Sequence, residues 1–359
     1  MSENIGGHRT LHRHLEEALV QHRSIEARFV RVPRPGWPRR VLGATWPLLG
    51  RYDLDFQPVR AQLAAAAVAR RLVAPLVDAA DVVHWYTANS ALLSLDLVSS
   101  RPSVVSLDMT NAQNSRRLPY RYPTRFTPFV TRPVANLERR VYERADAVVT
   151  KSEWAAESVL ADYGIDPLKV RVHAFGILTG PEPVPRPNRR PVLVFVGTTL
   201  ARKGGLALLD VWRRSLRDRA DLVLVTKDRV RAEPGLRVIG DVEVGDGRVN
   251  RILDESTVFA FPSSMDASPH VVFEAMAHGL PVVVCRSGGM PEQVIDGQTG
   301  FVVPPDDTQA LAAVLAKLVD NPDLAQAMGA AARADVQRHF DMAKQVVPFI
   351  EILREVAGR

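Results

Sequence analysis

Residues 258–303 alternate short apolar runs with helix-forming segments, and no other part of the sequence constrains the fold as strongly. Residues 258–261 and 280–285 are apolar runs of the length that a strand buried on both faces of a parallel sheet requires. Between them, Ser268 and Pro269 suit the start of a helix, and Gly279 suits its end. The pattern predicts strands and helices in alternation, which is typical of a doubly wound α/β fold.

Two acidic residues flank the predicted helix. Asp266 lies just before its start, and Glu274 lies about one and a half turns inside it. The free N–H groups at the start of a helix that follows a parallel strand form an anion site, and nearby carboxylates can accept hydrogen bonds from sugar hydroxyls. The arrangement favours a nucleotide-sugar pocket. The alternative is that Asp266 supports the helix cap and Glu274 lies on a solvated surface.

The same stretch carries a recognisable motif. Seven residues separate Asp266 from Glu274, a Glu-Ala-Met-Ala run ends at Ala277, and Gly288 and Gly289 stand just before a Pro-Glu pair. In this spacing the chain resembles the donor-site segment of glycosyltransferase family 4, the retaining enzymes of the GT-B fold. The resemblance covers most of the chain and is strongest between residues 146 and 305. The family's first acid is more often Glu, so the side chain of Asp266 is one methylene shorter.

The resemblance implies roles for the residues of a donor site. Asp266 is expected to contact the donor sugar, and Glu274 the ribose hydroxyls. Lys203 and Arg202 are expected to stabilise the departing diphosphate. The resemblance implies no metal and no cofactor, with a nucleotide-diphosphate sugar as co-substrate. The predicted catalytic residues are Asp266, Lys203, Arg202 and Asp108, and the predicted donor-binding residues are Gly6, Gly7, Gly197, Thr198, Ser268, Pro269, His270, Val271 and Glu274.

A second α/β unit is predicted to begin at residues 192–196, an apolar run that Gly197 follows. Arg202 and Lys203 stand just before a predicted helix, where cationic groups and helix N–H donors can together bind a diphosphate. Thr198 stands where the family has an arginine, and Arg202 is expected to replace it in part. The alternative is a solvated Arg-Lys pair. The sequence contains no GxGxxG fingerprint, which argues against a dinucleotide-dependent oxidoreductase.

The N-terminal half departs most from the family. Gly6 and Gly7 match its donor-side turn, but only four residues stand before Ile5 and the turn, so we expect the first strand of the sheet to be missing. Asp108 follows the predicted strand at residues 103–107, at the end where open α/β sheets place ligand contacts. The family often has His at this position. Asp108 is therefore predicted either to contact a sugar or to cap the strand end.

The expected domain organisation has two Rossmann-like, doubly wound domains of the GT-B class. Residues 1–180 form an acceptor-side domain, residues 181–191 a Pro-rich linker, and residues 192–340 a donor domain. Residues 341–359 are expected to form a helix that returns to the first domain. Phe175 and Gly176 replace the Asn-Gly turn of the family, and Gly176 is expected to supply a positive φ.

The composition excludes several classes of protein. The single cysteine, Cys285, lies in a predicted buried strand, so the chain has no disulfide framework and a reducing cytoplasm is the expected location. The chain contains no run of about 18 apolar residues that could span a membrane, and residues 1–14 have no apolar segment typical of a signal peptide.

Positive charge is concentrated in the first half of the chain. Residues 1–180 hold 24 Lys and Arg against 17 acids, and residues 111–145 hold eight arginines against two acids. Such a cluster can attract an anionic membrane surface or a lipid-linked acceptor, and it can equally be a solvated arginine-rich surface. Nucleic acid is not predicted as a partner, because no nucleic-acid-binding motif accompanies the charge.

Two smaller patterns receive structural interpretations. Asp53 and Asp55 have the spacing of a metal-diphosphate motif, but no clear buried strand stands before them, so we regard the match as coincidental. His84 lies at the end of the predicted strand at residues 81–85 and is either a core residue or part of a cleft.

The predicted function is transfer of a hexose-type sugar, with retention of configuration, from a nucleotide-diphosphate sugar to a hydroxyl acceptor. The donor is UDP-, GDP- or ADP-linked, and the acceptor is a glycan, a lipid-linked sugar or a small molecule. The alternative is a catalytically impaired GT-B protein that binds nucleotide or a partner without turnover, since Asp108, Thr198 and Phe175 depart from the family pattern.

Overall fold

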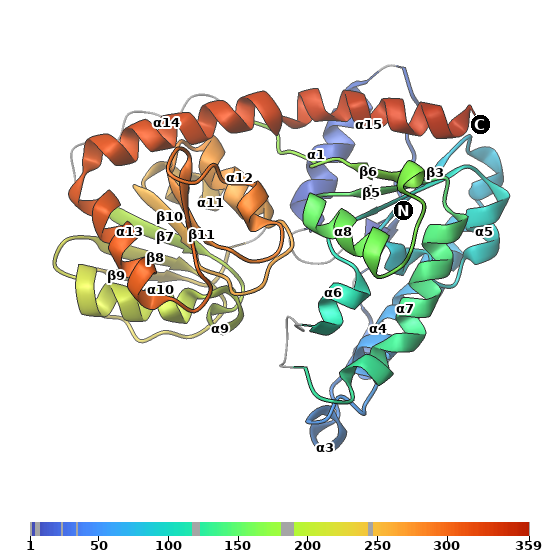
Figure 1. Cartoon of the computed structure of the whole chain (residues 1–359), viewed down its shortest axis with the longest axis horizontal. Helices are drawn as coiled ribbons and strands as arrows, with labels where there is room; N and C mark the ends of the chain where they lie inside the picture. The colour runs from blue at the N-terminus through green and yellow to red at the C-terminus, as the bar shows by residue number, and fades with distance from the viewer. Residues whose placement is uncertain are drawn as a thin grey trace. The chain divides into compact units, whose positions relative to one another are not determined.

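The computed structural model describes residues 2–3, 8–22, 24–33, 35–116, 123–180, 190–242 and 247–358. The chain divides into two compact units, the first formed by Met1–Phe175 and Val346–Arg359 and the second by Gly176–Gln345. Each unit contains a six-stranded parallel sheet flanked by helices (Figure 1). The expected fold class is confirmed. The division falls at Gly176, and most of the Pro-rich segment lies outside the described residues.

The sheet of the first unit does contain a first strand, contrary to the expectation from the sequence. Ser2 of that strand pairs with Arg31 on one side and with Tyr86 on the other. This strand is only two residues long and has no apolar run, so the sequence pattern does not predict it. The strand order is β2 (Arg31–Val32), β1 (Ser2–Glu3), β3 (Val83–Tyr86), β4 (Ser103–Leu107), β5 (Ala147–Thr150) and β6 (Val170–Val172).

The start of helix α7 in the first unit differs from the sequence pattern. The pattern predicts a helix from Leu137, but α7 begins ten residues earlier, where Pro128 starts the helix and a hydrogen bond from Thr127 to Asp53 holds its first turn. The helices are α1 (His8–Gln21), α2 (Trp37–Leu42), α3 (Pro47–Gly50), α4 (Gln57–Val73), α5 (Leu95–Ser100), α6 (Asn111–Arg116), α7 (Thr127–Arg144), α8 (Glu153–Ala161) and α15 (Met342–Ala357).

The last helix, α15, packs into the first unit through aromatic contacts. Phe349 lies with its ring centroid 4.9 Å from Phe175 and 4.8 Å from His84, and its ring stacks on His173 at 5.8 Å. All four side chains are largely removed from solvent. Phe175 therefore serves as a core residue here, where the family motif has an Asn. His84 is likewise a core residue, and it shares a hydrogen bond with Ser106 at 2.7 Å.

Gly176 is required for close approach and not for a positive φ, so that part of the sequence interpretation was wrong. A Cβ at this position would lie 1.8 Å from the carbonyl oxygen of Phe340. The two backbones meet there because Ile177 donates to Phe340 and Met342 donates to Ile177. Gly176 is absent from the residues that have positive φ among the described ones.

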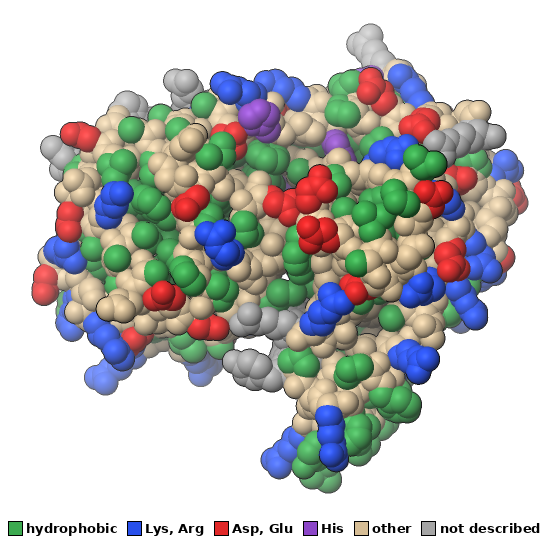
Figure 2. Space-filling model, in the orientation of Figure 1, with side chains coloured by type: hydrophobic (Ala, Val, Ile, Leu, Met, Phe, Trp, Pro, Cys, Tyr) green, Lys and Arg blue, Asp and Glu red, His purple; other side chains and the backbone are tan. Residues whose placement is uncertain are grey.

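Residues 33–47 are rich in Pro and Arg, a composition that predicts a loop, but they contain helix α2, and α3 begins at Pro47. Together these short helices form an extension of the first unit beside the starts of α4 and α7 (Figure 1). Figure 2 shows apolar and basic side chains over this extension. Asp53 and Asp55 lie at its base and are buried, and they accept hydrogen bonds from protein groups. This supports the interpretation of their spacing as coincidental.

The sheet of the second unit follows the predicted apolar runs closely. Its order is β12 (Gly300–Val303), β11 (Val282–Cys285), β10 (Val258–Phe261), β7 (Val192–Val196), β8 (Asp221–Val225) and β9 (Leu236–Ile239). Chain order runs outward from β7 to β9 and then resumes on the other side of β7 with β10. The boundary between β7 and β10 is therefore the switch point, where open α/β sheets place their ligands.

In the second unit, the structure differs from the sequence prediction at two helices. Helix α12 begins at His270 with Pro269 as its cap residue, so Ser268 is not the N-cap that the sequence suggests. Pro291 suits the start of a helix, but the segment around it forms only a single 3₁₀ turn, Met290–Glu292. The remaining helices are α9 (Leu200–Lys203), α10 (Gly205–Val211) with a π turn at Trp212–Leu216, α11 (Arg248–Asp254), α12 (His270–Ala277), α13 (Thr308–Asp320) and α14 (Pro322–His339). No described helix is long and apolar enough to cross a membrane.

The buried histidines predict that the first unit loses stability in mild acid. Burial lowers the pKa of His173 from 6.5 to about 4, and burial also lowers the pKa of His84 well below its ordinary value. The unfolded chain then binds more protons than the folded chain, so stability is fully present above pH 6.5 and falls as the pH drops toward 4. For His173 we expect about 2 kcal/mol to be lost at pH 5.

Urea unfolding at pH 7.5 and pH 5.0 tests this expectation. His173→Gln should shrink the difference in unfolding free energy between the two pH values, whatever its effect at pH 7.5. His339→Gln is the control, because the side chain of His339 is 53% exposed. An unchanged difference in the His173 variant would contradict the assignment.

Candidate active site

The loops that follow β7 and β10 touch through their backbones at the switch point of the second sheet. Gly204 has φ +78°, and a Cβ there would lie 1.9 Å from the carbonyl oxygen of Pro262. Ser263 donates a hydrogen bond to the carbonyl of Arg202 at 3.4 Å. The residue after Lys203 must therefore be glycine, both for its left-handed conformation and for the close approach.

A third loop, after β11, joins the same cluster. A Cβ on Gly288 would lie 1.8 Å from the carbonyl oxygen of Asp266. The N–H of Gly289 donates to the carbonyl of Ala267 at 2.6 Å, and the hydroxyl of Ser287 donates to the carbonyl of Ser264 at 2.7 Å. The Gly-Gly pair of the sequence motif thus holds the segment that contains Asp266 against the neighbouring loop.

Within this cluster the side chains of Lys203 and Asp266 form an ion pair. Each side chain is only 14% exposed, and the Lys203 ammonium also lies 5.3 Å from the centre of the Phe261 ring. The two residues are 63 positions apart in sequence, and the fold brings together the two charges that were predicted to bind the donor. Because little solvent reaches the two side chains, the attraction between their charges is screened less than in an ion pair on the surface.

The start of α12 contains the remaining residues of the predicted donor loop. The carbonyl of Pro269 accepts from the N–H of Val272 at 3.1 Å and from the side-chain amide of Gln293 at 3.3 Å. Ser268 and His270 are buried, whereas Val271 and Glu274 are half-buried. Glu274 lies on the second turn of α12, eight residues after Asp266.

The loop after β7 is fixed by a residue that the sequence analysis missed. Asp228 accepts a hydrogen bond from the N–H of Leu200 at 2.7 Å and so satisfies the start of α9, which carries Arg202 and Lys203. Thr198 is exposed, and its carbonyl accepts from the N–H of Lys227 at 3.3 Å. At Gly197 a Cβ would lie 2.7 Å from the ring of Phe195, which accounts for the glycine.

In the first unit, Asp108 follows β4 and is half-buried. Burial raises the pKa of the Tyr86 hydroxyl, and the negative charge of Asp108 raises it further. The carboxylate of Asp108 is therefore close enough to the Tyr86 hydroxyl for its charge to act on that group. Gly6 and Gly7, the predicted donor-side turn, lie outside the described residues.

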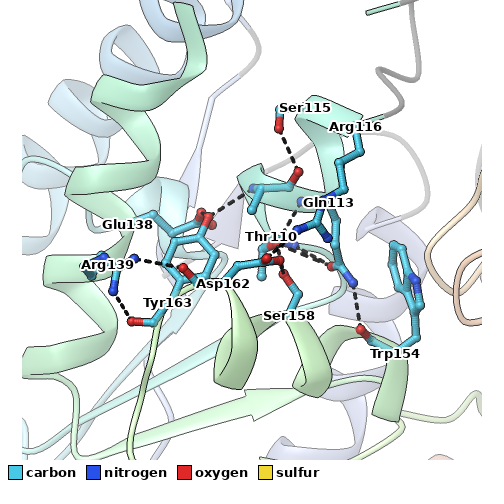
Figure 3. A network of polar contacts seen from close by, with 11 residues as sticks. Thr110, Gln113, Ser115, Arg116, Glu138, Arg139, Trp154, Ser158, Asp162 and Tyr163 are labelled. Carbon is cyan, nitrogen blue, oxygen red and sulfur yellow. Dashed lines mark hydrogen bonds and ion pairs between the residues drawn. The ribbon is translucent and has the colours of Figure 1, made fainter. Parts of the chain in front are cut away.

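A buried carboxylate, Glu138, anchors the helix that follows Asp108 (Figure 3). One of its oxygens accepts from the N–H of Asn111 at 3.0 Å and from the hydroxyl of Tyr163. The other oxygen accepts from the hydroxyl of Tyr142 at 2.8 Å. Burial raises the pKa of the Glu138 carboxyl, and the two tyrosine hydroxyls oppose that rise. Glu138 thus stabilises the start of α6.

The other side of α6 is held by a second set of contacts, also visible in Figure 3. The hydroxyls of Thr110 and Ser158 lie 2.7 Å apart, and Ser158 donates to Asp162 at 2.6 Å. The side-chain amide of Gln113 donates to the carbonyl of Trp154 at 2.7 Å. Helices α7 and α8 therefore both fix α6, and through it the strand end that carries Asp108.

This network also accounts for part of the basic cluster in residues 111–145. Arg116 pairs with Asp162, and Arg139 donates to the backbone carbonyls of Tyr163 and Asp162. These arginines serve internal contacts, which the charge count did not anticipate. Arg117 and Arg121 lie outside the described residues.

Two doubly wound units, with a lysine–aspartate pair at the switch point of the second, define a protein of the GT-B class. Residues 5–180 match the model of "Glycosyltransferase Family 4", and residues 190–321 match that of "Glycosyl transferases group 1". Alpha-maltose-1-phosphate synthase of Mycolicibacterium smegmatis is 30% identical over 323 residues, which are 78% of this chain and 80% of that protein. The chain belongs to this glycosyltransferase family and is an enzyme of this class.

Solved structures show the same fold at low sequence identity. Sucrose-phosphate synthase from Thermosynechococcus elongatus superposes with a TM-score of 0.74 at 19% identity, covering 99% of this chain and 94% of that one. Anabaena HepE, solved in complex with UDP-glucose, superposes with a TM-score of 0.62 at 19% identity, covering 79% and 82%. These likenesses confirm the GT-B fold.

The close approach at Gly204 predicts a large cost for adding one methyl group. Gly204→Ala combines left-handed strain of about 1 kcal/mol with a clash against the Pro262 backbone, which we expect to cost roughly 2 kcal/mol more. Gly297→Ala is the matched control, because Gly297 has φ +77° and a Cβ there would meet no heavy atom within 4 Å. Urea unfolding should separate the two variants, and equal losses would contradict the proposed loop contact.

Removal of the Glu138 carboxylate is expected to destabilise helix α6. Glu138→Ala leaves the hydroxyls of Tyr142 and Tyr163 and the N–H of Asn111 without their acceptor, so we expect a loss of roughly 3 kcal/mol or more. Amide hydrogen exchange should accelerate at α6 in this variant. Glu143→Ala is the control, because Glu143 lies on the exposed face of α7, the helix that also contains Glu138. Unchanged exchange at α6 in the Glu138 variant would show that the network does not hold the helix.

Proposed function

We propose that the protein transfers a hexose-type sugar, with retention of anomeric configuration, from a nucleotide-diphosphate sugar to a hydroxyl acceptor. The observation that carries this proposal is the Lys203–Asp266 pair at the β7–β10 switch point. Donor binding needs a positive charge beside the diphosphate and a hydrogen-bond acceptor for the sugar hydroxyls. The lysine and the aspartate at this position can supply one each.

The chemical role of the donor unit is electrostatic. As the bond between sugar and diphosphate breaks, negative charge grows on the leaving phosphate, and fixed positive groups lower the free energy of that state. Lys203, Arg202 and the N–H groups at the start of α12 are the groups that supply this field. In this proposal they do the work that a metal ion does in other transferases, and no cofactor takes part. The proposal assigns no protein nucleophile.

The ion pair itself implies an exchange of partners. A diphosphate that binds Lys203 competes with the Asp266 carboxylate for the same ammonium group. Once Lys203 contacts phosphate, Asp266 is released to accept hydrogen bonds from hydroxyls of the donor sugar. The pair therefore couples recognition of the diphosphate to recognition of the sugar.

Glu274 is assigned to the ribose hydroxyls, since it lies on α12 beyond the expected position of the diphosphate. UDP is the first nucleotide to test, because a structural neighbour was solved with UDP-glucose. GDP and ADP remain alternatives.

The acceptor is proposed to bind in the first unit, near Asp108 and α6. A sugar, a sugar phosphate or a lipid-linked sugar fits this proposal, and the relative that makes alpha-maltose 1-phosphate favours a sugar phosphate. The expected location is the cytoplasm, including the cytoplasmic face of the membrane for a lipid-linked acceptor.

A second candidate is a catalytically impaired member of the same family, which binds nucleotide with little turnover. The observations that favour it are the exposed Thr198, which replaces a family arginine, and Asp108, which replaces a family histidine. Release of nucleoside diphosphate from a nucleotide sugar, measured with candidate acceptors, distinguishes the two candidates.

The proposal predicts which residues control nucleotide affinity. Calorimetric titration with UDP, GDP and ADP should show binding of one nucleotide, weakened about 10- to 100-fold by Lys203→Ala through loss of a charge-assisted contact, and weakened also by Glu274→Ala. Lys317→Ala is the control, since Lys317 lies 5.2 Å from the Phe301 ring in the same unit, much as Lys203 lies near Phe261.

Asp266→Asn tests the exchange of partners in the same titrations. This variant removes the competing carboxylate, so the affinity for the free nucleoside diphosphate should rise while transfer of the sugar falls. Weaker binding of the nucleotide to Asp266→Asn would contradict the exchange. If the folded wild type bound none of the three nucleotides, the donor-site assignment itself would be wrong.

A further inference from the structure

Exposed apolar side chains are concentrated on the extension formed by α2 and α3. Of the 19 large hydrophobic residues that are exposed among the described ones, eight lie in residues 37–52 or at the start of α7. Trp37 and Leu48 are the most exposed of the eight, at 77% and 79%, and Phe129 is 65% exposed. The set, here called the apolar tip, is Trp37, Val41, Leu42, Trp46, Leu48, Leu49, Tyr52 and Phe129.

The apolar tip is a built surface, because buried polar contacts hold its backbone. Asp53 accepts from the side chains of Thr124 and Thr127, and Thr124 also donates to the carbonyl of Tyr52 at 2.9 Å. These bonds join α3 to the start of α7. A monomer rarely exposes a contiguous apolar surface of this kind unless it binds something.

A single arginine ties α2 to α4 beneath the tip. Arg60 donates to the carbonyls of Leu42, Ala44 and Asp55 at 2.7 to 2.9 Å, and its guanidinium lies 4.4 Å from the Trp46 ring. The backbone that presents the exposed aromatics is thus fixed by hydrogen bonds on its inner side.

The charge around the tip has one sign. Arg40, Arg51, Arg125 and Arg132 are exposed, and Arg39 is half-buried. Within the described residues of 35–60 and 123–137 the acids are Asp53 and Asp55, each 1% exposed and hydrogen-bonded to protein groups. Figure 2 shows green and blue side chains together on this extension. An occupant of the surface must therefore accept apolar groups and carry negative charge.

We propose that the apolar tip docks on an anionic lipid bilayer, with its aromatic and aliphatic side chains in the interface and its arginines among the headgroups. Tryptophan, tyrosine and phenylalanine beside arginine is the composition that membrane interfaces favour. A second copy of the chain fits poorly, because two surfaces of the same positive charge repel each other. The proposal does not rest on the proposed sugar transfer.

The arginines predicted from the sequence as a membrane patch divide between two roles. Arg116 and Arg139 serve the internal network, whereas Arg125 and Arg132 flank the apolar tip. The docking surface is completed by α2 and α3.

Vesicle sedimentation tests the proposal with the full-length protein. Vesicles of phosphatidylcholine with about 30% phosphatidylglycerol should bind the wild type, and vesicles of phosphatidylcholine alone should bind it at least tenfold more weakly. The variant Trp37→Ala with Leu48→Ala and Phe129→Ala should lose at least tenfold in binding. Its matched control replaces three exposed apolar residues elsewhere, Leu168, Leu206 and Ile295, by Ala.

The charge contribution is measured separately. Replacing Arg40, Arg51 and Arg125 by Gln should weaken binding to the anionic vesicles by about fivefold per arginine. The control removes the same charge from exposed positions elsewhere, by Arg217→Gln, Arg251→Gln and Arg338→Gln. Near-native circular dichroism and unchanged nucleotide affinity in the tip variants exclude misfolding as the cause.

Three outcomes would overturn the proposal. The first is a wild type that fails to bind anionic vesicles, and the second is equal vesicle binding by the tip and control variants. The third is a loss of self-association in the tip variants, measured by light scattering, with vesicle binding unchanged. This last result would assign the surface to a second copy of the chain. Loss of nucleotide binding in the donor-site variants bears only on the proposed sugar transfer, so the two proposals fail separately.

Discussion

The candidate site of the second unit depends on the close backbone contact of three loops at the carboxyl ends of β7, β10 and β11. Gly204 and Gly288 leave no room for a side chain, and the ion pair between Lys203 and Asp266 is the chemical result of that contact. The strand order makes the contact possible, because β10 returns to lie beside β7 after two strands have been added on the other side. Glycine is therefore as important to this site as the charged residues, since it sets how closely the charges approach.

In the first unit, the segment after β4, which contains Asp108 and leads into α6, is held by a different kind of interaction. No glycine contact holds α6 among the described residues, and a buried carboxylate takes that function. Glu138 accepts hydrogen bonds from three donors on α6, α7 and the segment after α8. A buried charge is costly unless its hydrogen bonds are satisfied, and here two of the three bonds come from residues at least 25 positions away, Asn111 and Tyr163. The position of Asp108 thus depends on a residue 30 positions away.

The sequence predicted the elements whose signals are local. Apolar runs gave β4, β7 and β10 at their observed bounds, and Ser152 caps α8 as a serine at that position should. The sequence did not predict the elements whose bounds depend on contacts between residues distant in the chain. Strand β1 is too short to show a pattern, and the first turn of α7 depends on a bond to Asp53, far away in sequence. Lys203 and Asp266 were found through their motif, whereas Glu138 was counted only as a charge, because two of its three partners are distant in sequence and reach it only in the fold.

The net charge of the chain is a poor guide to its surface, and the buried acids of the apolar tip show why. Asp53 and Asp55 look in sequence like a metal-diphosphate motif, yet the fold turns both inward and uses them to cap and join helices. This leaves the neighbouring arginines without exposed acids beside them, and it fixes the backbone that presents Trp37 and Leu48 to solvent. Because both carboxylates are buried, the surface presents no negative charge of theirs that would repel an anionic bilayer. Their hydrogen bonds also hold the backbone of that surface in place. A surface that is apolar, positive and rigid at once follows from their burial and not from the count of arginines.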